Sequence, residues 1–214
     1  MMKLKMFVTN EFMELCYLLI EENTKETAIV DPGMMKEAKI DEVCSFIEDN
    51  HLTVRYVLLT HAHVDHAASA EKLAKKYGVE VCGNIGDASL ARSLADQALR
   101  FHLPVKLSPL IIGRNLNDGD SLLLGSEQID VIATPGHSEG GLTYYAAASG
   151  FACVGDTIFD GSIGRTDLPG GDFETLIESI KTKIFALPDE TVLFSGHGPS
   201  TSVIREKNVN PYVQ

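Results

Sequence analysis

The apolar residues of the chain fall in short runs of β-branched, aliphatic and aromatic side chains. Four of these runs are closed by Thr or Gly, and each leads directly to a residue that can bind a metal ion. Such runs predict buried strands that deliver a polar residue at the strand end. We therefore expect four strand ends to meet at one rim. The runs are VRYVLLT before His61, DVIATPG before His137, FACVG before Asp156 and TVLFSG before His197.

Between the runs, apolar residues recur at helical spacing. This predicts helices over residues 36–48, 66–77, 88–100 and 172–185. The runs LTYYAAA and FACVG are separated only by Ser149 and Gly150, which predicts two neighbouring antiparallel strands. An α/β (α+β) fold, with a sandwich of mixed sheets and outer helices, therefore fits better than a purely parallel, doubly wound sheet.

Length and charge narrow the class of protein. The 214 residues favour a single domain over 1–214. With 30 acidic and 18 basic residues the formal net charge is −12, and no basic stripe offsets it, which argues against a nucleic-acid partner. No stretch has the pattern of a signal peptide or a membrane span, so we expect a cytoplasmic protein. The four cysteines form no C-x-x-C pair and are predicted to be buried, small apolar residues.

Five of the seven histidines cluster in three brief stretches of the chain. Side chains alternate along an extended segment, so His61, His63 and Asp65 are expected on one side, with His66 at the start of the next helix. Burying several imidazoles without a shared partner is costly, which favours a metal site. His51 and His102 are isolated and are interpreted as ordinary polar residues. The stretches are HAHVDH at 61–66, TPGHSEGG at 134–141 and FSGHGPS at 194–200.

The candidate ligands are too many for one tetrahedral ion and sufficient for two ions that share a ligand. Two metal ions about 3.5–4 Å apart can share a hydroxide and polarise an electrophile, which makes hydrolysis the natural reaction. Asp156 has two carboxylate oxygens and is the candidate bridging ligand. The alternative is that Asp156 caps the turn that follows it.

Four motifs, taken in order, closely resemble those of the metallo-β-lactamase-fold hydrolases. They are THAHVDH, TPGHSEGG, GDTIF and SGHGPS; the stretches GSIGRTDLPGGD and REKNVNPY are further similar to the short glyoxalase II-type hydrolases. The resemblance implies an αββα sandwich whose strand ends carry the site. It also implies one metal on His61, His63 and His137, a second on Asp65, His66 and His197, and Asp156 between them.

The activity implied by this resemblance is hydrolysis of a small-molecule thioester such as S-D-lactoylglutathione. The nucleophile would be a hydroxide shared by two divalent metal ions, zinc being the first expectation and iron or manganese the alternatives. Asp65 would orient that hydroxide as a catalytic residue. A thiolate leaves easily, so no strong general acid is required.

Arg165 and residues 88–113 each have two alternative roles on the sequence. Arg165 is the candidate for binding a substrate carboxylate; alternatively it holds Asp167 or Asp172 in the glycine-rich loop. Residues 88–113 form a lid or substrate wall, or else core or a dimer face. Full-length glyoxalase II enzymes carry a C-terminal helical domain that supplies part of the glutathione site, and we expect none here.

Other functions remain open on the sequence. A persulfide dioxygenase shares the fold and would hold a single iron on His61, His137 and Asp156. A true β-lactamase is disfavoured by Asp156, since those enzymes generally lack a bridging aspartate. A diiron electron-transfer role would need a flavin domain, and a non-catalytic binding module would be expected to have lost a ligand. The oligomeric state is left open.

Overall fold

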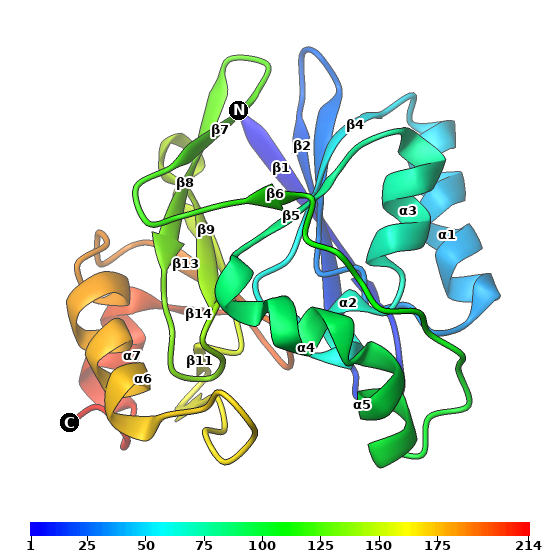
Figure 1. Cartoon of the computed structure of the whole chain (residues 1–214). Helices are drawn as coiled ribbons and strands as arrows, with labels where there is room; N and C mark the ends of the chain where they lie inside the picture. The colour runs from blue at the N-terminus through cyan, green and yellow to red at the C-terminus, as the bar shows by residue number, and fades with distance from the viewer.

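The computed structural model describes all residues, 1–214, and arranges them in four layers. Two β-sheets pack face to face and helices cover their outer faces (Figure 1). This confirms the expected sandwich of mixed sheets. No helix combines the length and the apolar character needed to cross a membrane.

The first sheet has the strand order β1-β2-β3-β4-β5-β6. Its first three strands are antiparallel neighbours, whereas β3, β4, β5 and β6 are parallel. The sheet is therefore mixed, and its parallel part places the end of β4 beside the ligand-rich loop. The strands are β1 (Met2–Val8), β2 (Leu15–Glu21), β3 (Glu26–Val30), β4 (Thr53–Leu58), β5 (Val81–Gly83) and β6 (Arg114–Asn115).

The second sheet has the order β14-β13-β10-β9-β8-β7. Only β10 and β13 are parallel, and the predicted antiparallel pair β9–β10 is confirmed. Three of the four ligand-bearing strands belong to this sheet. The strands are β7 (Ser121–Leu124), β8 (Glu127–Ala133), β9 (Leu142–Ala146), β10 (Phe151–Gly155), β13 (Val192–Ser195) and β14 (Thr201–Ser202), and a separate hairpin joins β11 (Ile158–Phe159) to β12 (Ser162–Ile163).

The helices are shorter and more numerous than predicted. The periodicity expected over 66–77 and 88–100 is interrupted at Ala68–Ser69 and at Ser93, and the last predicted helix changes to a π-turn at Ile180–Ile184. The Ser69 hydroxyl donates to the Pro32 carbonyl, a tertiary contact at the first break. The helices are α1 (Glu37–Asp49), α2 (Val64–Ala67), α3 (Ala70–Tyr77), α4 (Ala88–Arg92), α5 (Leu94–Arg100), α6 (Phe173–Ser179) and α7 (Val203–Val209), with 3₁₀ turns at Ile85–Asp87 and Ala147–Ser149.

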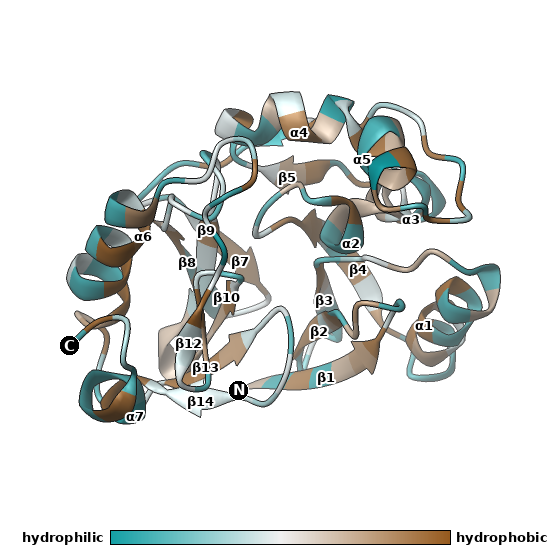
Figure 2. Cartoon of the chain, turned by 90° about the horizontal axis from the view of Figure 1, so that it is seen from below, coloured by the Kyte–Doolittle hydropathy of each residue, from teal (hydrophilic) through white to brown (hydrophobic).

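Three apolar clusters lie between the four layers. One fills the space between the two sheets, one lies under α1, α3 and α5, and one lies under α6 and α7. Most strands of the two sheets are coloured as hydrophobic, and the helices carry both hydrophilic and hydrophobic residues (Figure 2). The four cysteines are free and buried, as predicted.

Two tyrosines cross the sandwich and fix the ligand-bearing ends of the strands. The hydroxyl of Tyr144, fully buried on β9, donates to the Leu59 carbonyl at 2.7 Å. The hydroxyl of Tyr17 on β2 donates to the Ser195 carbonyl at 2.6 Å. Leu59 and Ser195 each lie two residues before a histidine of the candidate site. Both hydrogen bonds therefore fix the position of one sheet relative to the other next to that site.

The C-terminal helix α7 anchors the hairpin that follows Asp156. Glu206 is fully buried, and its carboxylate accepts hydrogen bonds from the Gly161 amide and the Asn210 side chain. Asn210 also donates to the Ser162 carbonyl. The REKNVNPY motif thus has a structural role, since it positions the β11–β12 hairpin.

Candidate metal centre

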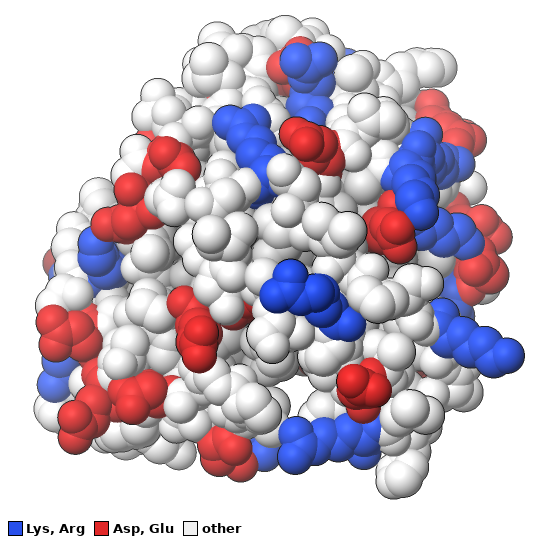
Figure 3. Space-filling view, viewed as in Figure 1, with Lys and Arg blue, Asp and Glu red and all other residues white.

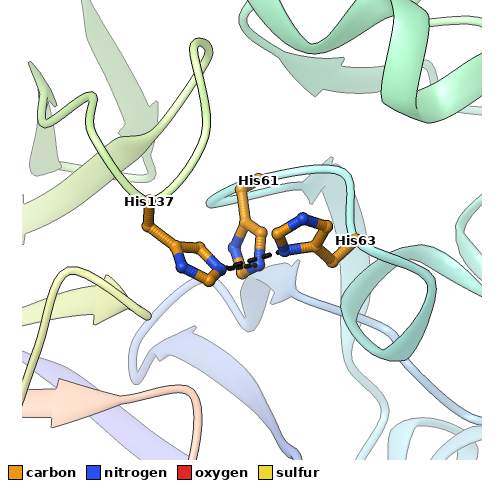
Figure 4. Close-up of side chains that lie close together, drawn as sticks. All are labelled: His61, His63 and His137. Atoms are coloured by element: carbon orange, nitrogen blue, oxygen red, sulfur yellow. Dashed lines mark hydrogen bonds between the residues drawn. The ribbon is translucent and has the colours of Figure 1, made fainter. Parts of the chain in front are cut away.

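Three histidines from two loops converge at the rim of the sandwich. His61 and His63 lie between β4 and α2, and His137 follows β8 in the opposite sheet (Figure 4). The His137 Nε2 atom lies 2.9 Å from His63 Nδ1 and 3.2 Å from His61 Nε2. All three side chains are buried, so three ring nitrogens share one enclosed point.

The surroundings keep the imidazoles of His61 and His63 neutral. Burial, reinforced by the neighbouring histidines, lowers the pKa of His61 well below its ordinary value. Burial and His137 likewise lower the pKa of His63 to about 4. Neutral imidazole is the form that binds a divalent metal, because its unprotonated nitrogen offers a lone pair.

A second group lies beside the first. Asp65 and His66 belong to the first turn of α2, and His197 follows β13. The Asp65 Oδ2 atom lies 3.4 Å from His197 Nε2 and 3.9 Å from His66 Nε2. This set contains one carboxylate and two imidazoles, which is a common donor set for zinc or iron.

Asp156 lies between the two groups. Its Oδ1 atom is 3.4 Å from His66 Nε2, and its Oδ2 atom is 3.6 Å from His137 Nε2 and 3.7 Å from His197 Nε2. Burial alone would raise the pKa of Asp156, but His66 and the other histidines outweigh it and hold this pKa well below its usual range. The carboxylate is therefore ionised and faces both sets.

The donor set fits two divalent cations. His66 Nε2 and Asp156 Oδ1 are buried without a hydrogen-bond partner in the chain. Buried polar atoms without partners are uncommon and costly, and a cation between them would satisfy both. The residues that would hold the ions are the ones singled out in the sequence: His61, His63 and His137 for one, and Asp65, His66 and His197 for the other, with Asp156 shared.

The structure corrects one step of the sequence-based reasoning. The strand β4 ends at Leu58, so His61, His63 and Asp65 do not alternate along an extended strand. His63 is the N-cap of α2, and the turn of this helix directs Asp65 away from His61 and His63 and towards His197. Helix geometry, rather than a two-residue period, separates the ligands into two groups.

Asp31 is a supporting residue that the sequence analysis did not single out. In the sequence AIVDPG, Asp31 has the position of an ordinary turn residue. In the structure its carboxylate accepts hydrogen bonds from the Thr60 amide and hydroxyl and lies 3.0 Å from His66 Nδ1. Although Asp31 is also close to His61, its oxygens are already engaged. We infer that Asp31 orients the His66 ring, since a carboxylate that binds the second ring nitrogen of a metal-ligating histidine fixes its tautomer.

Asp87 joins the two loops that carry the first three histidines. Its buried carboxylate accepts hydrogen bonds from the Ala62 amide at 2.9 Å, the Ser138 hydroxyl at 2.9 Å and the Gly140 amide at 2.7 Å. These donors lie in the loops that follow β4 and β8, which belong to opposite sheets, so Asp87 fixes the separation of the two loops. A lone aspartate between a strand and a helix has no sequence pattern that distinguishes this role from an ordinary cap.

Arg165 lies at the cavity and is already paired. Its side chain lines the pocket over the metal centre, and its Nε and Nη2 atoms bind the Asp167 carboxylate at 2.7 and 2.8 Å. The Arg165 carbonyl accepts the hydrogen bond of His137 Nδ1 at 2.7 Å, so the main chain of this residue orients a ligand. Both readings of Arg165 therefore have a structural basis, and substrate binding by its free N–H groups stays a prediction.

The two isolated histidines and the two tyrosines of the LTYYAAA run lie outside the centre. His51 and His102 are exposed and adopt positive φ angles of 53° and 55° at the ends of α1 and α5. Tyr144 is buried between the sheets, and Tyr145 packs under α6, so neither faces the site. Residues 88–113 serve two purposes, because Ala91, Leu94, Ala98 and Leu110 are core while other residues of the segment line a pocket.

One glycine allows the hairpin to pass behind Asp156. A Cβ atom on Gly164 would lie 1.8 Å from the Asp156 carbonyl oxygen and 3.1 Å from His137 Nδ1. We expect Gly164→Ala to cost about 1–3 kcal/mol of stability through overpacking and to lower metal content, as measured by thermal unfolding and elemental analysis. Gly83→Ala is the matched control, because its Cβ would meet Leu59 at an ordinary 3.5 Å. Equal behaviour of the two variants would contradict this role of Gly164.

The metal-site cavity has a volume of about 230 Å³ and opens to solvent. One side is formed by Phe12, from the β1–β2 loop, and Phe101, which follows α5; their rings meet edge to face at 5.9 Å. The Phe12 carbonyl also accepts a hydrogen bond from His197 Nδ1 at 2.9 Å. The cavity thus has an apolar side, formed by Phe12 and Phe101, next to the polar and charged side chains of the candidate metal ligands. It is lined by Phe12, His63, Val64, Asp65, Phe101, His137, Asp156, Arg165, Leu168 and His197.

Comparison with protein families agrees with this geometry. Residues 9–197 match the family model of the metallo-beta-lactamase superfamily. The chain belongs to this superfamily. As a metallo-beta-lactamase superfamily protein it is a metallo-hydrolase whose His and Asp groups can bind metal ions.

Individual relatives resemble this superfamily member over their full lengths. Hydroxyacylglutathione hydrolase GloC of Haemophilus influenzae is 37% identical, with 99% of this chain and 98% of the relative covered. A solved structure of the BLEG-1 B3 metallo-beta-lactamase superposes with a TM-score of 0.88 at 31% identity, covering 99% and 100% of the two chains. TTHA1623 in a di-iron-bound form gives a TM-score of 0.86 at 30% identity, covering 97% and 99%.

Proposed function

We propose that the protein hydrolyses a hydroxyacylglutathione thioester, such as S-D-lactoylglutathione, to a hydroxy acid and a free thiol. The observation that carries this proposal is the meeting of two ligand groups at Asp156, in a chain that matches a hydroxyacylglutathione hydrolase over its full length. The same observation supports a centre of two divalent ions, with zinc as the first candidate and the iron of a solved relative as the next.

The metal ions, when bound, would supply Lewis-acid polarisation of the carbonyl and would lower the pKa of water. The chain supplies the remaining elements. The Asp65 carboxylate lies at the cavity and is held ionised, because His66 and a hydrogen bond to His197 outweigh the effect of burial on its pKa. It is therefore placed to accept a proton from the attacking water.

The reaction would proceed by addition and elimination at the thioester carbonyl. The water oxygen bonds to the carbonyl carbon, its proton passes to Asp65, and the C–S bond then breaks with the electron pair leaving on sulfur. The thiolate takes up a proton from solvent to give the free thiol, and Asp65 returns its proton to solvent. Because a thiolate is a stable leaving group, the site needs no acid on that side. Phe12 and Val64 at the wall would limit access of bulk water to the reacting atoms.

The test is free-thiol release from S-D-lactoylglutathione by the metal-loaded protein, with a chelated sample as control. We expect rapid release that chelation abolishes. Protein that retains its metal and releases no thiol would overturn the proposal.

A second candidate rests on a specific contact. His137 Nε2 lies 3.2 Å from His61 Nε2 and 3.6 Å from Asp156 Oδ2. This set of two histidines and one aspartate would also suit a mononuclear iron persulfide dioxygenase. Oxygen consumption with glutathione persulfide, at one iron per chain, would favour that function. Turnover of a chromogenic cephalosporin would instead favour a β-lactamase.

A further inference from the structure

A second pocket lies beside the metal-site cavity. It has a volume of about 190 Å³ and is formed by α4, α5 and the Leu168–Pro169 segment ahead of α6. His63, Phe101 and Leu168 line both spaces, so the two are adjacent. The surface is hollowed here, between α5 and the loop that precedes α6 (Figure 3). We call this space the side pocket; its other lining residues are Ser89, Leu90, Ser93, Asp96, Gln97 and Arg100.

The side pocket carries one charge of each sign, and both are free. Asp96 and Arg100 lie one turn apart on α5, are exposed, and take part in no ion pair of the chain. Arg165, by contrast, already has a carboxylate partner in Asp167. A free guanidinium is suited to a carboxylate, and a free carboxylate is suited to an ammonium group. The pair therefore complements an α-amino acid group, which carries both.

The floor of the side pocket connects to the metal ligands. The Gln97 side chain accepts a hydrogen bond from the Val64 amide at 2.9 Å, and its amide group donates to the Ala62 and Leu90 carbonyls at 3.4 and 2.9 Å. Ala62 and Val64 flank His63. A ligand in the side pocket would thus rest on the same helix that fixes the His63 loop, at a defined position relative to the metal centre.

We propose that the side pocket binds the amino acid end of the thiol half of the substrate, with Arg100 on its carboxylate and Asp96 on its ammonium group. This assignment rests on the proposed thioester hydrolysis for its role in catalysis. The γ-glutamyl end of glutathione has this chemistry. The two spaces together reach the volume of about 300–1,000 Å³ that small-molecule sites occupy.

Binding is measured first, independently of turnover. The probe is S-methylglutathione, whose blocked sulfur is a poor metal ligand, titrated into the metal-loaded protein by calorimetry. We expect Arg100→Gln to weaken binding about tenfold, the change expected for loss of one charge-assisted hydrogen bond. Arg92→Gln is the matched control, because Arg92 is an exposed arginine at the end of α4 that does not line the pocket. Equal affinities of the Arg100→Gln variant and wild type, or no binding by wild type, would overturn the assignment.

Two further variants separate charge from shape. Asp96→Asn removes the negative charge and is expected to weaken the probe severalfold. Ser89→Phe would fill the pocket while both charges remain, and is also expected to weaken the probe. Metal content should match wild type in both variants. Unchanged probe affinity in both would contradict the assignment.

Turnover is measured second, on S-D-lactoylglutathione and on the lactoyl thioester of N-acetylcysteamine, which has neither charged group. We expect Arg100→Gln to raise KM about tenfold for the first substrate, to leave kcat within twofold, and to leave the neutral thioester unaffected. Equal losses on both substrates would overturn the subsite. If wild type binds the probe through Arg100 and yet hydrolyses neither thioester, the proposed function fails while the binding site stands.

Discussion

Replacing Asp156 with Asn is expected to lower turnover at least about 100-fold and to reduce the metal content. The carboxylate approaches ligands of both sets, with Oδ1 at 3.4 Å from His66 Nε2 and Oδ2 at 3.6 Å from His137 Nε2. An amide keeps the shape but carries no negative charge. Shape matters here, since a Cβ on Gly196 would already lie 2.3 Å from Asp156 Oδ1, so the isosteric change is the least disruptive one.

The control for this variant is Asp160→Asn. Asp160 follows four residues later, is exposed and pairs with Arg205 at 2.6 Å, away from the histidines. We expect it to keep wild-type turnover and metal content, both measured on the same preparations as the Asp156 variant. Wild-type turnover in the Asp156→Asn protein would remove this residue from the centre.

Removal of the metal ions is expected to lower the melting temperature by about 10 °C. A ligand present at 1,000 times its dissociation constant stabilises the native state by about 4 kcal/mol, and each kcal/mol shifts the melting temperature of a chain of this size by about 2–4 °C. Without the ions, a protonated His66 can balance part of the negative charge of the neighbouring carboxylates. Burial opposes its protonation, but Asp156, Asp65 and Asp31 outweigh burial and raise the pKa of His66 well above the ordinary value. We therefore expect the chelated protein to stay folded.

The measurement is thermal unfolding followed by circular dichroism, before chelation, after chelation and after metal is restored. Metal content is determined by elemental analysis on each sample. The Asp156→Asn variant is the internal control and should show a much smaller shift on chelation. Identical melting curves for loaded and chelated wild type would show that the ions do not stabilise the native state.

The sequence predicted the fold and the identity of the clustered residues because both depend on local pattern. Apolar runs of strand length define buried strands, and ligands placed directly after them are brought together by the sheets, as for His137 and His197. The division of the ligands into two groups was implied by resemblance alone. The local reasoning failed at Asp65, where a helical turn replaces the expected extended segment.

The supporting residues could not be identified from the sequence, for a physical reason. Asp31, Asp87 and Gln97 act through hydrogen bonds to groups 29–53 positions away, or to main-chain atoms, so no local spacing marks them. The pairing of Arg165 with Asp167 is local, yet a short spacing in a glycine-rich loop leaves open whether the two side chains meet. Tertiary contacts decided each case.

The carboxylate of Asp87 also bears on how the protein acquires its ions. Asp87 holds the His61–His63 loop against the His137 loop through three hydrogen bonds within the chain, and these bonds favour the convergence of the three imidazoles independently of any ion. Little reorganisation is then required on loading, and a site of nitrogen and oxygen donors accepts several first-row ions. We therefore expect the ion in a purified sample to reflect the supply during growth and the order of exposure, so that metal content has to be controlled before rates from different preparations are compared.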